Sequence, residues 1–131
     1  MTCLRVYEQA EKAIQEHRWI QSEKAGRDLG SDAEQEWIEI YRRRFCRSRF
    51  VQHVRGKTFF EEFGHECFGV VTEDFAEFRH LLNTMFALVS EGAENLDLVR
   101  WAEVRSLPRD RVLNVLAAMD INSHRLLPPL R

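Results

Sequence analysis

The sequence predicts an all-α fold, a bundle of five or six helices that forms a single domain over residues 1–131. Three observations favour this class. The chain holds six glycines and three prolines, and two of those prolines lie in the last four residues, so its interior has few helix breakers. Apolar side chains recur every three or four residues in several segments, which is the period of a helix with one buried face. No Asn-Gly or Asp-Gly pair marks the turn of a β-hairpin.

An antiparallel helical hairpin is expected over residues 1–56. Its first helix should run from Thr2 to Ala25 and stop at Gly26, because glycine enters the left-handed conformation at little cost. The apolar stripe of this helix comprises Val6, Tyr7, Ala10, Ala13, Ile14, His17 and Ile20. A second helix should run from Ser31 to Arg55, opened by a capping box of Ser31 and Glu34. The short link between the two helices favours antiparallel packing.

A second helical unit is expected over residues 57–131. Thr58 and Glu61 form another capping-box pattern and predict a short helix that ends at Phe63. Residues 64–71 contain two glycines and predict a loop or a single extended piece.

Three further helices should complete this unit. The longest should run from Thr72, a good N-cap residue, to a stop at Gly92. Its core stripe comprises Phe75, Phe78, Leu82, Met85, Phe86 and Val89. Two shorter helices are expected over residues 96–105 and 108–119, since Pro108 suits a first helical position. The tail from residue 122 should be irregular.

Charge and composition bound the class of protein. The formal net charge is -2, so the molecule as a whole does not attract nucleic acid or an acidic membrane. The apolar runs fall far short of the roughly 20 residues that a bilayer crossing needs. The N-terminal segment is charged throughout and lacks the apolar core of a signal peptide. Three widely spaced cysteines suit free thiols, so we expect a cytoplasmic protein that does not enter a membrane.

Residues 97–116 resemble a helix-turn-helix. Ala102, Leu107, Val112 and Val115 stand where that motif has its small and buried residues, whereas Ser106 stands where glycine is usual. The resemblance implies nucleic-acid binding, with the helix over residues 108–119 in the major groove. Three side chains would then face bases or phosphates: Arg109, Arg111 and Asn114.

A second interpretation of this segment is a simple helical corner, which needs the same small and apolar residues. Charge favours it. From Lys57 onward the chain has twelve Asp and Glu against eight Lys and Arg, an excess of four acids that a duplex would repel.

A run of five arginines lies over residues 42–49 of the second predicted helix: Arg42, Arg43, Arg44, Arg47 and Arg49. They could form a solvated face paired with glutamates, or a patch for nucleic acid or another acidic partner. Arg44 falls close to the apolar stripe of this helix, and a guanidinium near a core needs a carboxylate partner. Glu16 or Glu23 of the first helix could supply it.

Residues 17–30 carry the pattern H-x-W-I-x-S-E-K-A-G-x-D-L-G. This block is similar to a family of uncharacterised bacterial helical domains. The resemblance implies bacterial origin and a helical hairpin, and it implies no chemistry.

His17 lies at the centre of the first apolar stripe, where a histidine is usually a core residue with one hydrogen-bond partner. The alternative is a small-ligand or proton-transfer site formed by His17, Glu23 and Arg44. Cys46, His53, His65 and Cys67 are suitable metal ligands, but their spacing matches no zinc pattern, and we expect no metal. No phosphate-binding loop or nucleophile elbow is present in the sequence, so we expect no cofactor and no nucleophilic catalysis.

The sequence therefore favours a non-enzymatic binding or regulatory module that acts through helical surfaces. Its partner would be another protein or a second copy of the chain, because three aromatic residues lie off the predicted stripes: Trp19, Phe45 and Phe50. A nucleic-acid-binding protein and a small-ligand receptor or enzyme are the two alternatives.

Overall fold

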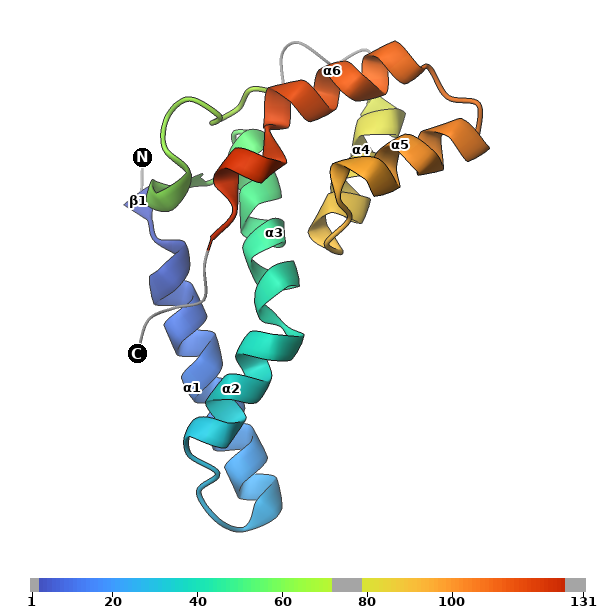
Figure 1. Cartoon of the computed structure of the whole chain (residues 1–131). Helices are drawn as coiled ribbons and strands as arrows, with labels where there is room; N and C mark the ends of the chain where they lie inside the picture. Colours follow the sequence, from blue (N-terminus) through green and yellow to red (C-terminus); the bar gives the residue numbers. More distant parts are fainter. Residues whose placement is uncertain (1–2, 72–78, 127–131) are drawn as a thin grey trace.

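The computed structural model describes residues 3–71 and 79–126 of the chain. In these ranges the protein is mostly helical, with one pair of two-residue strands, which confirms the all-α class in its coarse form (Figure 1). The α-helices are α1 (Val6–Ala25), α2 (Ser31–Ile40), α3 (Arg42–Val54), α4 (Arg79–Ser90), α5 (Asn95–Val104) and α6 (Arg109–Met119). The short elements are β1 (Cys3–Leu4), β2 (Phe59–Phe60) and two 3-10 turns, η1 (Glu61–Phe63) and η3 (Ile121–His124).

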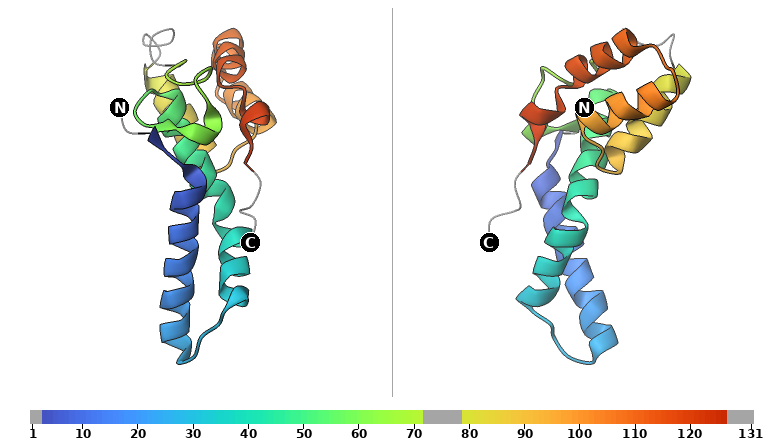
Figure 2. Two further views of the ribbon diagram at one scale, coloured as in Figure 1. Left: turned by 90° about the vertical axis from the view of Figure 1, so that its left-hand side faces the viewer. Right: turned by 45° about the vertical axis from the view of Figure 1, so that its right-hand side comes forward.

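The helices form an elongated molecule. The antiparallel pair of α1 and α2 projects away from the unit that contains α4, α5 and α6, and α3 extends from one part into the other (Figure 2). Accordingly α2 packs on α1, α3 packs mainly on α4, and α6 packs on α5. No helix in the described ranges has the length and apolarity needed to cross a membrane.

Two clusters of buried side chains hold these parts together. The smaller one lies inside the hairpin and consists of Ala10, Ile14 and Trp37. The larger one fills the space where α3 meets α4, α5 and α6, and its fully buried members include Val54, Met85, Val89, Leu98 and Met119. Phe45 on α3 packs against both clusters, so α3 is the structural link between them.

The first helix begins at Val6, later than the predicted Thr2, which lies outside the described residues. The preceding residues Cys3 and Leu4 instead form β1, which pairs in parallel with β2. The Glu62 carboxylate accepts the backbone N–H groups of Val6 and Tyr7, each at 2.7 Å. Free N–H groups at a helix start favour such a carboxylate, so a distant residue caps α1.

The capping box predicted at Ser31 is wrong. Gly30, in the left-handed region at φ 56°, holds the cap position, and no side chain caps α2. Glu34 turns instead toward α1, where its Oε2 accepts hydrogen bonds from Gln15 at 2.9 Å and from Arg18 at 3.1 Å. The pairing of the two helices therefore takes the carboxylate that the sequence pattern assigned to a cap.

The single helix predicted from Ser31 to Arg55 is interrupted at Tyr41, which separates α2 from α3. The break coincides with a change of partner, because α2 packs on α1 whereas α3 packs mainly on α4. The buried face of α3 is consequently not a continuation of the face of α2 on which Trp37 is buried. It consists of Arg47, Phe50, Val51, His53 and Val54.

The capping box predicted at Thr58 is also wrong, because Phe59 and Phe60 form β2 and a single 3-10 turn follows. His53 on α3 fixes this segment. Its Nδ1 accepts the Phe60 N–H at 2.9 Å, and its Nε2 lies 2.7 Å from the Gly64 carbonyl oxygen. The His53 ring is completely buried and contacts the rings of Phe59, Phe63 and Phe68.

The helix predicted from Thr72 is described from Arg79 onward, and the predicted cap at Thr72 with Phe75 and Phe78 lies outside the described residues. The rest of its stripe is buried, with Met85 and Val89 fully so. Gly92 ends the segment at φ 100°, as predicted, and its N–H donates to the Val89 carbonyl oxygen. The α5 and α6 bounds agree with the predicted helices to within one residue at each end.

Candidate functional site: an arginine pocket

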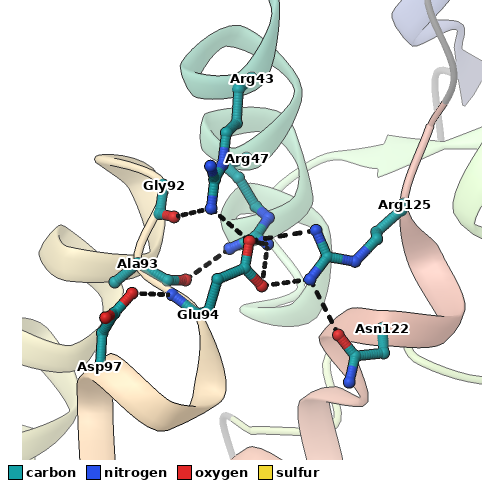
Figure 3. A network of polar contacts seen from close by, with 8 residues as sticks. All are labelled: Arg43, Arg47, Gly92, Ala93, Glu94, Asp97, Asn122 and Arg125. Carbon is teal, nitrogen blue, oxygen red and sulfur yellow. Dashed lines mark hydrogen bonds and ion pairs between the residues drawn. The ribbon is translucent and has the colours of Figure 1, made fainter.

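Three arginines converge on one carboxylate where α3 meets the start of α5 and the C-terminal segment (Figure 3). Arg47 Nη2 lies 3.1 Å from both oxygens of Glu94. Arg43 donates to Glu94 Oε1, and Arg125, which follows η3, donates to both Glu94 oxygens. The Glu94 carboxylate thus joins α3, the start of α5 and the segment after η3.

Backbone carbonyl groups fix two of these arginines. Arg43 Nη2 donates to the Gly92 carbonyl oxygen at 2.6 Å, and Arg47 Nη1 donates to that of Ala93 at 2.7 Å. The Glu94 N–H donates in turn to Asp97 at 2.8 Å, which closes the first turn of α5. The link between α4 and α5 is therefore held against α3 by charged hydrogen bonds, which are stronger than neutral ones.

A pocket of about 300 Å³ opens beside this network. It is lined by Arg42, Arg43, Cys46, Arg47, Phe50, His124, Arg125 and Leu126, so four of its eight residues are arginines and none is acidic. Phe50 and His124 stack at a centroid distance of 5.6 Å along its apolar side. The pocket therefore combines positive charge with an aromatic wall.

Arg42 is the least satisfied member of the pocket. Its Nη1 donates to the Leu126 carbonyl oxygen at 2.9 Å, whereas its Nε is buried and has no hydrogen-bond partner. A buried donor without a partner is costly and rare in native proteins. It indicates a place where an acceptor oxygen from outside the chain would be stabilising.

The protonation states leave the pocket positive. Burial alone would raise the pKa of the Glu94 carboxyl, but hydrogen bonding and charge from Arg125 and Arg47 hold that pKa below its ordinary value. Burial lowers the pKa of Arg47, and Glu94 counteracts the change. Glu94 is thus ionised at neutral pH, and the four arginines that line the pocket carry three more charges than this one carboxylate.

The sequence singled out Arg44 from the arginine run, and the structure places that residue differently. Its side chain is 69% exposed, and its Nε lies 3.6 Å from Glu91. Arg47, which is 6% exposed, is the arginine that enters the core. The available signal was the spacing of Arg47, Phe50 and Val54, which puts the three on one helical face.

The other two members of the predicted ligand site also have separate surroundings. His17 is half-buried, with its Nε2 2.8 Å from Glu36 and its ring against that of Tyr41. Glu23 lines an open hollow at the hairpin tip beside Trp19. No contact among the described residues joins His17, Glu23 and Arg44.

The block at residues 17–30 builds the hairpin turn. Gly26 adopts φ 72°, and the Leu29 N–H donates to Ser22 Oγ at 3.0 Å. Arg18 donates twice to Asp28, at 3.0 and 2.7 Å, and these hydrogen bonds lower the pKa of Asp28 to about 2. These positions therefore have a conformational role.

The three aromatic residues that suggested self-association differ in their burial. Phe50 is buried in the main core, and Phe45 packs edge to face on Trp37 at 5.2 Å. Trp19 is 65% exposed. Among the three, only Trp19 is exposed to solvent.

The residues predicted to contact nucleic acid lie on the outer side of α6. Arg109, Arg111 and Asn114 are all exposed, and Arg109 Nη1 lies 3.9 Å from Glu103. Ala102, Val112 and Val115 are buried between α5 and α6. Ser106 between these helices is left-handed at φ 54°, the conformation that glycine would adopt without strain.

The suitable metal ligands do not cluster. Cys46, Cys67 and Cys3 are free thiols, and Cys67 donates to the Phe63 carbonyl oxygen at 3.3 Å. In residues 3–71 and 79–126, no three His, Cys, Asp or Glu side chains come together as metal ligands.

The chain was compared with protein-family models, with curated proteins and with solved structures, and none of them matches it.

Proposed function

We propose that this chain is a non-enzymatic binding module whose arginine pocket receives an oxyanion carried by a ligand. The observation that carries this proposal is the convergence of four arginines on a cavity with no acidic residue in its lining. Among the described residues, the one carboxylate that accepts hydrogen bonds from Arg43, Arg47 and Arg125 is Glu94, which lies beside the cavity.

The geometry suits an anion for two reasons. Guanidinium groups present planar, paired donors that match the oxygens of phosphate or carboxylate. Arg47 and Arg42 are already oriented by the carbonyl oxygens of Ala93 and Leu126, so binding has little side-chain entropy to remove. The volume of about 300 Å³ lies at the lower end of the range for small-molecule sites, which favours a compact anionic group.

Replacing Arg42 with glutamine should weaken anion binding by about tenfold or more, because a hydrogen bond to a charged group contributes about 1.5–3 kcal/mol. Inorganic phosphate, sulfate and citrate are suitable probes, titrated by calorimetry at constant ionic strength. The matched control is Arg44→Gln on the same helix, which removes an arginine that lies outside the pocket lining. It should bind as the unmodified protein does.

Two results would contradict the proposal. One is an unmodified protein that binds none of the three anions at millimolar concentration. The other is equal losses in the Arg42→Gln and Arg44→Gln variants, since these would indicate a general charge effect and no defined pocket.

Nucleic-acid binding through α6 is the second candidate, and one observation favours it. Ser106 takes the left-handed conformation at the position where a helix-turn-helix normally has glycine. Exposed Arg109, Arg111 and Asn114 follow on the next helix. The excess of acids in this half of the chain places this candidate after the arginine pocket.

A duplex-binding chain should be retained on immobilised DNA at low salt and released steeply as salt rises. An Arg109→Ala, Arg111→Ala double variant should lose most of that retention, whereas Arg42→Gln should keep it. Absence of retention at about 50 mM salt would eliminate this candidate without affecting the first one.

A further inference from the structure

We infer that Glu94 occupies the position of the ligand's oxyanion in the unliganded protein, and that a dianionic phosphate group displaces it. This inference rests on the function proposed above and specifies its ligand and its regulation. Glu94 then acts as an internal competitor, built into the start of α5.

The contacts of Glu94 are those expected of a bound anion. Its two oxygens receive five contacts from three guanidinium groups, three on Oε1 and two on Oε2. A single carboxylate carries one negative charge among four arginines, so the site is under-neutralised. A phosphate monoester has three terminal oxygens and close to two charges at neutral pH, so it fits the donors and the charge better.

Access to these contacts is from the solvent side. The side chains of Arg43 and Arg125 are 55% and 48% exposed, whereas the side chain of Arg47 is buried and anchored to Ala93. An incoming dianion would reach Arg43 and Arg125 first and exchange with their bonds to Glu94. Arg47 would stay in place and complete the binding site.

Release of Glu94 gives up one half of the capping box of α5, in which the Glu94 side chain accepts the Asp97 N–H, and keeps the other half. The Glu94 side chain is 28% exposed, so the displaced carboxylate has a path to water. Its backbone N–H remains bonded to Asp97, which is the acidic side chain of the first turn of α5. The links that would be lost are those from the Glu94 carboxylate to Arg43, Arg47 and Arg125. Phosphate binding would therefore detach the start of α5 from the C-terminal segment, and the bound anion would join α3 to Arg125 instead.

The decisive experiment compares Glu94→Gln with Glu91→Gln in a titration with inorganic phosphate at pH 7.5. Both variants remove one negative charge from the same region, and Glu91 faces Arg44 outside the pocket lining. Removing the competing carboxylate should tighten phosphate binding by about tenfold, since losing a competing charged contact is equivalent to about 1.4 kcal/mol. Glu91→Gln should bind as the unmodified protein does.

The possible results separate the two proposals. If phosphate binds equally well or less well to Glu94→Gln than to the unmodified protein, the anion sits beside Glu94 and this inference is wrong, although the pocket binds anions. If neither protein binds phosphate, the proposed function itself fails. If the two glutamine variants gain equally, the change is one of overall charge and the inference is again wrong.

A second measurement needs no substitution, which matters if Glu94→Gln does not fold. The carboxyl carbon of Glu94 can be titrated by NMR with and without sulfate, an anion that stays doubly charged across this pH range. Displacement from Arg125 and Arg47 should raise the pKa of Glu94 toward its ordinary value. A pKa that is unchanged or lower in saturating sulfate would contradict the inference.

Discussion

Arg47→Ala should lower the free energy of unfolding by about 3 kcal/mol, the lower end of the range for breaking a buried ion pair. Arg47 is 6% exposed on the inner face of α3. Its loss leaves the Ala93 carbonyl oxygen without its donor and Glu94 with one guanidinium fewer. The estimate stays at the lower end because Arg43 and Arg125 still bind Glu94.

Denaturant unfolding monitored by circular dichroism measures this effect. Arg44→Ala is the control, because Arg44 is two-thirds exposed and its contact with Glu91 is a surface pair. It should change stability by no more than about 0.5 kcal/mol. If the two variants unfold at the same denaturant concentration, the network around Glu94 contributes nothing to stability.

His53→Ala should be destabilising by about 3–5 kcal/mol, since it combines a cavity with the loss of two buried hydrogen-bond partners. His53 is completely buried among phenylalanine rings. Without it, the Phe60 N–H and the Gly64 carbonyl oxygen have no partner from α3. The β2 segment should lose its attachment, and β1, which pairs with it, should fray at the same time.

The same residue makes stability depend on pH. Burial lowers the pKa of His53, and the hydrogen bond to Gly64 counteracts only part of that change. A protonated ring also cannot accept the Phe60 N–H. The unfolded chain, with a histidine pKa of about 6.5, therefore binds the proton more readily than the folded one. Stability is fully present above pH 6.5 and should fall by up to about 1.4 kcal/mol per pH unit below it.

Unfolding curves between pH 7.5 and pH 5 measure this slope. His65→Ala removes an exposed histidine whose charge is the smallest of the causes that lower the pKa of His53, so it should keep most of the slope, whereas His53→Ala should lose most of it. A slope that survives in His53→Ala would assign the acid sensitivity to another group.

The helices could be predicted because their signals are local. Apolar periodicity and glycine stops lie within a few residues of each other, and the predicted bounds of the last two helices agree closely with the structure. The inner face of α3 was not predicted, although Arg47, Phe50 and Val54 have helical spacing, because that spacing alone does not say which face is buried. It depends on the change of partner at Tyr41, which puts Arg47 in the core and leaves Arg44 in solvent.

Only part of the arginine pocket could be predicted from the sequence. The run on the second predicted helix was recognised, whereas Glu94 and Arg125 lie 47 and 78 positions beyond Arg47 and carry no pattern of their own. The two capping boxes failed for a similar reason. Glu34 bonds to α1, and the residues after Thr58 pair with β1, so contacts distant in sequence override local preference.

The cap that Glu62 places on α1 has a consequence for biosynthesis. Val6 precedes Glu62 by 56 positions, so all of α1 has been synthesised before the carboxylate that caps it is translated. A nascent chain stalled within the hairpin therefore carries a first helix with an unfinished end. The order of translation leaves that end, and the strand pair beside it, to form only after Phe59, Phe60 and Glu62 have been translated.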